Sequence, residues 1–210
     1  MSGKEQQAGH GIKVRAAAQR KRILHAAQKC FVERGFRAAS MATIAETAAM
    51  SPGLIYRYFR GKNEIILAII EQQLGVARER IAELHATEDI AAALAGSYGV
   101  AEQEDGERIS APLFLEMSAE ATRNPQIAAA AHVSDAAVRE AIAQVLMRGS
   151  AQGGYGMSRA AAVERALMLM CLFEGLRVRE AREPRLNRKL LKAALTRLLA
   201  AILAPPSRSA

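Results

Sequence analysis

Residues 51–59 read Ser-Pro-Gly-Leu-Ile-Tyr-Arg-Tyr-Phe and predict a short helix with a single buried face. Ser51 is a favoured N-cap residue, and Pro52 takes the first helical position, where its missing N–H has no partner to lose. Ile55 and Phe59 stand four positions apart, so they share one side of the helix and can pack inward. The small, polar and aromatic residues around them are left at the surface.

A second short helix is predicted directly before this one, over residues 41–48, with Ser40 as its N-cap. Its apolar positions follow helical spacing, and a tight turn joins it to the helix that begins after Ser51. Two short helices connected in this way have the proportions of a helix-turn-helix, whose second helix enters the major groove of DNA. A longer helix from Val14 to Arg34 precedes them and should end at Gly35.

The rest of the chain also reads as helix, so we expect an all-α protein of about nine helices. Strong helix formers dominate, and no stretch alternates apolar and polar residues for long enough to form a strand. Glycine and proline cluster at the joints between the predicted helices. The further helices are expected near residues 63–85, 88–97, 107–123, 126–151, 158–181 and 185–204.

The excess positive charge of the chain is confined to its first third. The 210 residues carry a formal net charge of +8, but residues 1–62 hold 12 Lys and Arg against 3 Glu, and the remainder is nearly neutral. This asymmetry indicates a module that binds a polyanion, joined to a module with another task. A basic face that only aids solubility is the alternative.

Membrane and secreted proteins fit this sequence poorly. The longest apolar run, residues 166–173, is much shorter than the ~20 residues of a membrane-spanning helix. The basic first residues contain no apolar segment of the kind found in secretory signals. Cys30 and Cys171 lie far apart in apolar surroundings, which predicts buried free thiols in a cytoplasmic protein.

An enzyme is also disfavoured. The chain contains none of the common motifs of hydrolases, zinc proteases or phosphate-binding loops, and its four histidines are scattered. We therefore expect no catalytic residue, no metal site and no cofactor. An all-helical adaptor that binds another protein through its basic end is the competing hypothesis, and salt-sensitive, sequence-selective binding to duplex DNA would distinguish the two.

The order and spacing of residues 23–64 resemble those of the TetR/AcrR family of one-component transcriptional regulators. The resemblance is carried by the run from Ile23 to Phe36 and by Ile44-Ala45, Ser51-x-Gly53, Ile55-Tyr56-x-Tyr58-Phe59 and Lys62-x-Glu64. Ala49-Met50 departs from the family pattern, in which glycine and valine are usual, and should tighten the turn between the two short helices.

The resemblance implies four regions along the chain. We expect a disordered basic tail over residues 1–12, a three-helix helix-turn-helix domain that binds DNA over residues 13–62, a helical domain for effector binding and dimerisation over residues 63–204, and a disordered tail over residues 205–210. The basic N-terminal extension could reach into a minor groove, or it could only raise non-specific affinity for DNA.

The resemblance also implies which residues contact DNA, namely Ser40, Thr43, Ser51, Pro52, Gly53, Leu54, Tyr56, Arg57, Tyr58 and Lys62. Tyr56 is expected at a phosphate, and Lys62 at the DNA backbone. Arginine can read guanine with two hydrogen bonds, but the sequence leaves open whether Arg57 reads a base or only a phosphate. For Tyr56 and Tyr58, packing within the domain is the alternative.

The last two predicted helices are expected to form a dimer interface, as they usually do in the family. A helix that is apolar on every side must be covered on every side, and both helices carry long apolar stripes. The expected interface residues are Val163, Leu167, Leu191, Leu195, Leu198 and Ile202. A large core within a monomer is the alternative.

Soft, aromatic and acidic residues of the second domain are candidates for binding a small-molecule effector. They are Phe114, Met117, Glu120, Met147, Met170, Phe173 and Glu174, although methionine and phenylalanine are equally ordinary core residues. Glu116, Glu120 and Glu174 interrupt apolar faces, and a buried carboxylate needs a partner, for which a cationic ligand would serve. Residues 113–125 are similar to the C-terminal domain of the branch that regulates choline-to-betaine metabolism, so a choline-like effector is a hypothesis.

The sequence therefore predicts a homodimeric, ligand-responsive transcriptional repressor. Its expected partners are a palindromic site in double-stranded DNA, a second copy of the chain and an unidentified small molecule, but no membrane. Each subunit would place one recognition helix in one of two successive major grooves. Ligand would pivot the helix that begins near Asn63 and release the DNA. Repression rather than activation is what the family implies.

Overall fold

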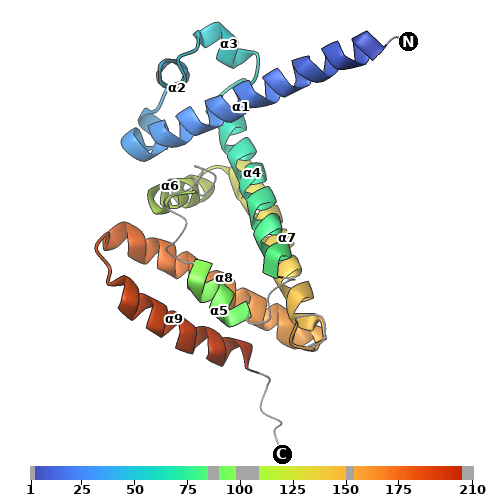
Figure 1. Cartoon of the computed structure of the whole chain (residues 1–210). Helices are drawn as coiled ribbons and strands as arrows, with labels where there is room; N and C mark the ends of the chain where they lie inside the picture. The colour runs from blue at the N-terminus through green and yellow to red at the C-terminus, as the bar shows by residue number, and fades with distance from the viewer. Residues whose placement is uncertain (1–2, 85–89, 98–108, 150–153, 205–210) are drawn as a thin grey trace, which may run out of the picture. The chain divides into compact units, whose positions relative to one another are not determined.

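A computed structural model describes residues 3–84, 90–97, 109–149 and 154–204 (Figure 1). Within these ranges the backbone forms nine α-helices and no strand, which confirms the predicted all-α class. The helices are α1 (Gly3–Ala38), α2 (Met41–Thr47), α3 (Pro52–Tyr56), α4 (Lys62–Glu83), α5 (Ile90–Ser97), α6 (Ala111–Ala121), α7 (Pro125–Met147), α8 (Arg159–Arg182) and α9 (Arg188–Leu203). None of the described helices is both long and apolar enough to cross a membrane.

The chain divides into two compact units. The N-terminal unit comprises the residues up to Ile70 together with Leu115–Ala128, and the C-terminal unit comprises Glu71–Phe114 and the residues from Ala129 onward. Helices α4, α6 and α7 each contribute residues to both units. The N-terminal unit therefore contains the first turns of α4 and parts of α6 and α7, in addition to the three helices expected for a DNA-binding domain.

Helix α1 is longer than the sequence predicted. It begins at Gly3, so residues 3–12, which we expected in a disordered tail, are helical. Alanine, glutamine, lysine and glutamate in this segment have favourable helix propensities, which outweigh the three glycines among them. Residues 1–2 and the expected tail over 205–210 lie outside the described residues.

A break at Gly35 divides α1 into a long helix and one further turn. Gly35 has φ 74° and ψ 157°, and the chain then re-enters helical geometry as far as Ala38. The amide of Ala39 donates to the carbonyl of Gly35 at 3.2 Å, which closes this turn. The predicted end of the first regular helix at Gly35 thus corresponds to a sharp change of chain direction.

The N-terminal unit has a core of large apolar side chains. Phe31 and Phe36 stack edge to face with 5.2 Å between ring centroids on the two sides of the break. Burial of each large apolar side chain contributes about 1.5–3 kcal/mol, so this core holds the short helices α2 and α3 in place. Its fully buried members are Ile23, Ala27, Phe31, Ile44, Ile55, Phe59, Ile65, Ile66, Ile69 and Ile127.

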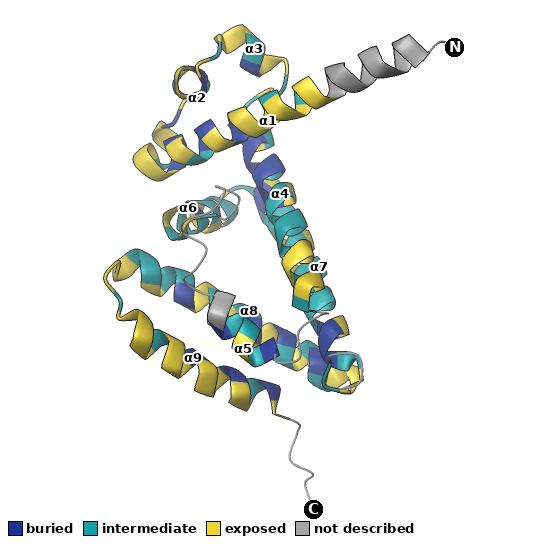
Figure 2. Ribbon diagram, viewed as in Figure 1, coloured by how far each residue is buried: buried dark blue, intermediate teal, exposed yellow. Residues whose placement is uncertain are grey.

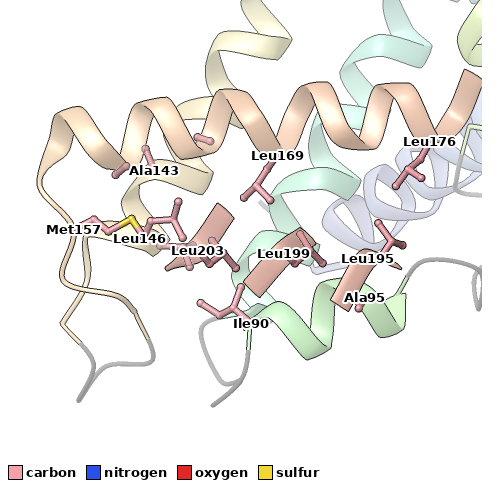
Figure 3. Close-up of a cluster of buried hydrophobic side chains, with 13 residues drawn as sticks. Ile90, Ala95, Ala143, Leu146, Met157, Leu169, Leu176, Leu195, Leu199 and Leu203 are labelled. Carbon is pink, nitrogen blue, oxygen red and sulfur yellow. The ribbon is translucent and has the colours of Figure 1, made fainter. Parts of the chain in front are cut away.

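The core of the C-terminal unit is built mainly from α5, α7, α8 and α9 (Figure 3). Helix α9 packs against both α5 and α8. Leu195, Leu199 and Leu203 form its buried stripe, and they meet Leu169 of α8 and Ile90 of α5 within one apolar cluster. This cluster gives α9 one buried side and leaves its opposite side exposed (Figure 2).

Replacing Gly35 with alanine should destabilise the protein by about 1–3 kcal/mol, because its φ and ψ are a combination that glycine alone adopts readily. Crowding is not the cause, since the nearest atom to an added β-carbon would be a carboxylate oxygen of Glu116 at 3.5 Å. The matched control is Gly75→Ala in α4, where an added β-carbon meets no atom within 4 Å. That variant should be neutral or up to about 1 kcal/mol more stable. Urea unfolding followed by circular dichroism measures both; equal effects would contradict the account of Gly35.

Candidate functional site

Helices α2 and α3 form a helix-turn-helix with both predicted N-caps in place. The hydroxyl of Ser40 accepts a hydrogen bond from the amide of Thr43 at 3.0 Å, and that of Ser51 accepts one from the amide of Leu54 at 3.3 Å. These two side chains accept hydrogen bonds from amides at the starts of α2 and α3, and the amide of Leu54 also donates to the backbone carbonyl of Ser51 at 3.0 Å. Ser40 and Ser51 are therefore structural caps as well as exposed residues of the motif.

The turn between α2 and α3 is a Schellman motif with alanine in the left-handed position. Ala49 has φ 49°, the amide of Met50 donates to the carbonyl of Ala45, and the amide of Ala49 donates to that of Glu46. Glycine is the usual residue at such a position, because a β-carbon costs about 1–2 kcal/mol there. The tight turn that the sequence suggested at Ala49 is thus present, with a strained backbone.

Helix α3 has one buried face and an exposed N-terminal end (Figure 2). Ile55 and Phe59 are 0% and 2% exposed, which confirms the prediction that both are core residues. The side chain of Tyr56 is 55% exposed, and Arg57 is exposed beside it. Among the other expected contact residues, Pro52 and Gly53 are exposed, and Thr43, Leu54 and Tyr58 are half-buried. These expected contact residues are therefore all at least partly accessible at the surface of the motif.

Two arginines of α1 support this motif, and the sequence analysis did not single them out for that role. Arg22 donates to the carbonyl of Ala49 at 3.2 Å, at the strained position of the turn. The guanidinium of Arg20 lies over the ring of Phe59 at 4.8 Å. Nothing in the local sequence of either arginine shows that the turn and the Phe59 ring lie against it.

Lys62 makes its contacts within the protein. Its ammonium donates to the carbonyls of Phe36 at 2.6 Å and Arg37 at 3.1 Å, and it lies 4.7 Å from the centre of the Phe36 ring. Burial lowers the pKa of Lys62 below its usual value, while the nearby carboxylate of Glu120 acts in the opposite direction. The structure thus places Lys62 as a tie between α4 and the end of α1, and its expected contact with the DNA backbone stays a prediction.

Two of the three glutamates that interrupt apolar faces have partners within the N-terminal unit. The carboxylate of Glu116 accepts a hydrogen bond from the amide of Phe36 at 2.9 Å. Glu120 pairs at 3.3 Å with Arg123, which lies in the turn after α6. Neither carboxylate therefore requires a ligand to satisfy it, which the sequence could not show because the partner of Glu116 lies 80 positions away.

The seven expected effector residues are divided between the two units. Met117 and Glu120 belong to the N-terminal unit, and the other five belong to the C-terminal unit. Met147 and Phe173 are half-buried and pack against the C-terminal core. Methionine and phenylalanine at helical spacing suit a hydrophobic core as well as a ligand pocket, and Met147 and Phe173 contribute to the core.

A smaller group of polar and aromatic side chains remains in the C-terminal unit. Arg177 of α8 lies over the ring of Phe114 at 5.3 Å and donates to the carbonyl of Ile109 at 3.0 Å. The pKa of Glu174 is raised by partial burial and by the neighbouring carboxylate of Asp135, while Arg177 lowers it. Burial likewise raises the pKa of Asp135. Both residues are exposed, so these two neighbouring carboxylates are accessible to a cation from solvent.

The expected dimer residues divide between the core and the surface. Leu195 is 2% exposed and belongs to the chain's own core, so it is not accessible to a second copy. Val163, Leu191 and Ile202 are half-buried against the same core. Leu167 and Leu198 are 49% and 45% exposed. The apolar stripe of α9 correctly predicted that one side of the helix is buried. A stripe alone does not distinguish burial within the same chain from burial against a second chain.

The exposed side of α8 and α9 is rich in apolar side chains. Leu167, Met168, Leu190 and Leu198 are four of the eight large apolar side chains that are exposed among the described residues. Cys171, predicted as a buried thiol, is exposed on α8, whereas Cys30 is buried as expected with its sulfur 3.2 Å from the hydroxyl of Thr47. We refer to Leu167, Met168, Cys171, Leu190 and Leu198 as the α8–α9 apolar face.

Comparison with known proteins identifies relatives of both parts of the chain. The family model described as "Bacterial regulatory proteins, tetR family" matches residues 23–69, and the one described as "BetI-type transcriptional repressor, C-terminal" matches residues 98–204. The HTH-type transcriptional regulator UidR of Escherichia coli K12 is 35% identical over 147 residues, which cover 68% of this chain and 71% of UidR. These relatives are regulators of transcription and not enzymes.

Solved structures share the fold along most of the chain. GusR of Salmonella enterica superposes with a TM-score of 0.73 at 27% identity, over 89% of this chain and 95% of GusR. A transcriptional regulator of Saccharomonospora viridis, solved in complex with choline, superposes with a TM-score of 0.67 over 87% of this chain and 96% of that one. Its 23% identity shows a common fold alone.

Proposed function

Because this chain belongs to the TetR family of DNA-binding transcriptional regulators, we propose that it is a homodimeric repressor that binds a palindromic operator and leaves it when a small molecule binds. The observation that carries the proposal is the exposed end of α3, with Tyr56 and Arg57 at the surface and Ile55 and Phe59 buried beneath them. A helix presented in this way can enter a major groove while its other face stays attached to the domain.

The N-terminal part of α1 is proposed to add non-specific affinity. A minor groove is about 6 Å wide, whereas a helix with its side chains is about 10–12 Å across. Because α1 is helical from Gly3, it does not fit a minor groove as an extended arm would. Positive side chains such as Arg15, exposed on α1, suit the phosphate backbone instead.

Selection of bound duplexes from a random pool, with the purified full chain, tests the proposal directly. A repressor of this kind should enrich a palindrome whose half-sites are separated by roughly 34–36 Å, or one helical turn of DNA. Affinity should fall steeply with salt, because binding releases counterions from phosphates. Failure to enrich any sequence would favour a protein-binding adaptor and contradict the proposal.

Arg57→Ala should weaken binding to the selected duplex by about 1–3 kcal/mol and leave binding to a random duplex nearly unchanged, if Arg57 reads a base. The matched control is Arg60→Ala, since Arg60 lies beyond α3 with a side chain that is 92% exposed. That variant should weaken both duplexes alike, through loss of charge. Titration of both variants against both duplexes measures the difference. If the two variants behave alike, Arg57 contacts only phosphate.

The α8–α9 apolar face is proposed to be the dimer interface. Single exposed apolar residues are ordinary on protein surfaces, but here four large ones lie on two helices that pack against each other. A two-fold axis would place this face against itself in the second copy, which is the commonest arrangement of a homodimer. Of the residues expected from sequence, Leu167 and Leu198 remain in the proposed interface. Buried Leu195 is left out, and exposed residues such as Met168 are added.

Leu198→Glu should shift the protein toward monomer. Each chain of the dimer would bury one unpaired carboxylate at about 1–3 kcal/mol, so the dimer should lose about 2–6 kcal/mol. The control is Val133→Glu on α7, because Val133 is also exposed and apolar but lies outside the proposed interface. Light scattering after size-exclusion chromatography gives the mass of each variant. If the Leu198→Glu variant dimerises as tightly as the unmodified chain, this interface is ruled out.

The effector is proposed to be a cationic small molecule, with a quaternary amine such as choline as the first candidate. The BetI-type family model matches the C-terminal part of the chain, and one structural relative holds choline. Within this chain, the neighbouring carboxylates of Glu174 and Asp135 are exposed and would attract a positive charge. The guanidinium over Phe114 indicates that this ring already accepts a cation.

Choline at about 100 times its dissociation constant should stabilise the protein by about 2.7 kcal/mol, which raises the melting temperature by several degrees. Glu174→Gln should reduce that shift, because it removes one negative charge from the group around Arg177. Glu183→Gln, which changes an exposed glutamate paired with Arg179 at the end of α8, is the control and should keep the shift. Thermal-shift measurements with quaternary amines, fatty acids and aromatic acids identify the chemical class of the effector. No shift with any amine would exclude a choline-like effector.

A further inference from the structure

The joint between α1 and α2 depends on polar contacts from distant parts of the chain. At Gly35 the backbone leaves helical geometry and then begins the new turn that ends at Ala38. The first amides of a helical turn have no partner within it, and an amide left without one destabilises a buried segment. Phe36, the first residue of this turn, is buried, so its amide needs an acceptor from elsewhere.

Glu116 supplies that acceptor from α6. Its carboxylate lies 2.9 Å from the amide nitrogen of Phe36 and 3.5 Å from where a β-carbon of Gly35 would be. Hydrogen bonds to a charged acceptor are about twice as strong as neutral ones, and a negative charge at the start of a helical turn is favourable. The contact therefore acts as an N-cap donated by a helix 80 positions further along the chain.

Lys62 completes the arrangement from the opposite side of the same turn. Its ammonium binds the carbonyls of Phe36 and Arg37. A carboxylate from α6 thus holds an amide of the turn, and an ammonium from α4 holds its carbonyls. Two residues after Ala38, Ser40 caps α2, so the direction of α2 and α3 follows from how this turn is fixed.

We propose that Glu116 is a positioning residue, which fixes the turn after Gly35 through the amide of Phe36 and so orients α2 and α3 for specific DNA binding. The inference rests on the proposed function, because it assigns a role in DNA recognition to a residue that does not touch DNA. Helix α6 also begins in the C-terminal unit, where Arg177 holds the carbonyl of Ile109 just before it. Glu116 and Phe36 themselves both belong to the N-terminal unit, so the proposed contact lies within one unit.

The test compares three changes at Glu116 with a control at Glu33. Glu116→Ala removes the acceptor, Glu116→Gln keeps an amide oxygen as acceptor without the charge, and Glu116→Asp keeps the charge but shortens the side chain by one methylene. Glu33→Ala removes the same charge from an exposed position on α1, where Glu33 pairs only loosely with Lys29 at 3.9 Å. For each full-length variant, we would measure affinity for the selected duplex and a random duplex, the melting temperature, and hydrogen exchange of the Phe36 amide.

Glu116→Ala should bind the selected duplex about tenfold more weakly, with little change for the random duplex, and its Phe36 amide should exchange at least about tenfold faster. Glu116→Gln should recover most of both properties, and Glu33→Ala should resemble the unmodified chain. If Glu116→Ala does not fold, Glu116→Asp is expected to show the same loss of specific affinity. A purely stabilising residue would lower the melting temperature and leave specific affinity of the folded protein unchanged.

Two results would overturn the inference. The first is faster exchange at Phe36 in Glu116→Ala with undiminished affinity for the selected duplex. The second is a Gln variant as impaired as the Ala variant, which would assign the effect to charge instead of the hydrogen bond. Failure of the proposed function looks different, because the unmodified chain itself would then select no duplex, and no variant could lose a preference that it lacked.

Discussion

The backbone at Gly35 is the constraint on which the N-terminal unit depends. A φ of 74° turns the chain away from the axis of α1. The amide of Phe36 after this break donates to Glu116, and the carbonyl of Phe36 accepts from Lys62. Helices α2 and α3 are too short to be stable alone, since isolated helices under about 12 residues are marginal in water. Their orientation is therefore inherited from the turn that follows Gly35 and from the apolar core around Phe31.

Local features of this unit could be predicted from sequence because their causes are local. Ser40 and Ser51 cap the amides three residues ahead of them, and Ile55 and Phe59 share a face by spacing alone. The roles of Arg22, Lys62 and Glu116 depend on which distant peptide groups lie nearby, and no short pattern encodes that. Lys62 illustrates the difference, since its position in the motif was recognised while its partners proved to be carbonyls of the protein.

The C-terminal unit shows a different limit of sequence reasoning. Periodicity identified the apolar stripes of α8 and α9, but only burial separates Leu195, inside the chain, from Leu198, on its surface. Similarly, methionine and phenylalanine on helices were compatible with a pocket or with a core, and Met147 and Phe173 pack against the core. A hydrophobic pattern predicts that a helix face will be buried. The fold determines whether the same chain or a partner buries it.

Ala49 has a consequence for the local stability of the protein. Its left-handed backbone costs about 1–2 kcal/mol, and the Arg22 hydrogen bond to its carbonyl offsets about as much. Local opening of a segment requires less free energy where its native conformation is strained. The turn between α2 and α3 is therefore held by the guanidinium of Arg22 as well as by its two backbone hydrogen bonds, and loss of that guanidinium would lower the free energy needed to open the turn locally.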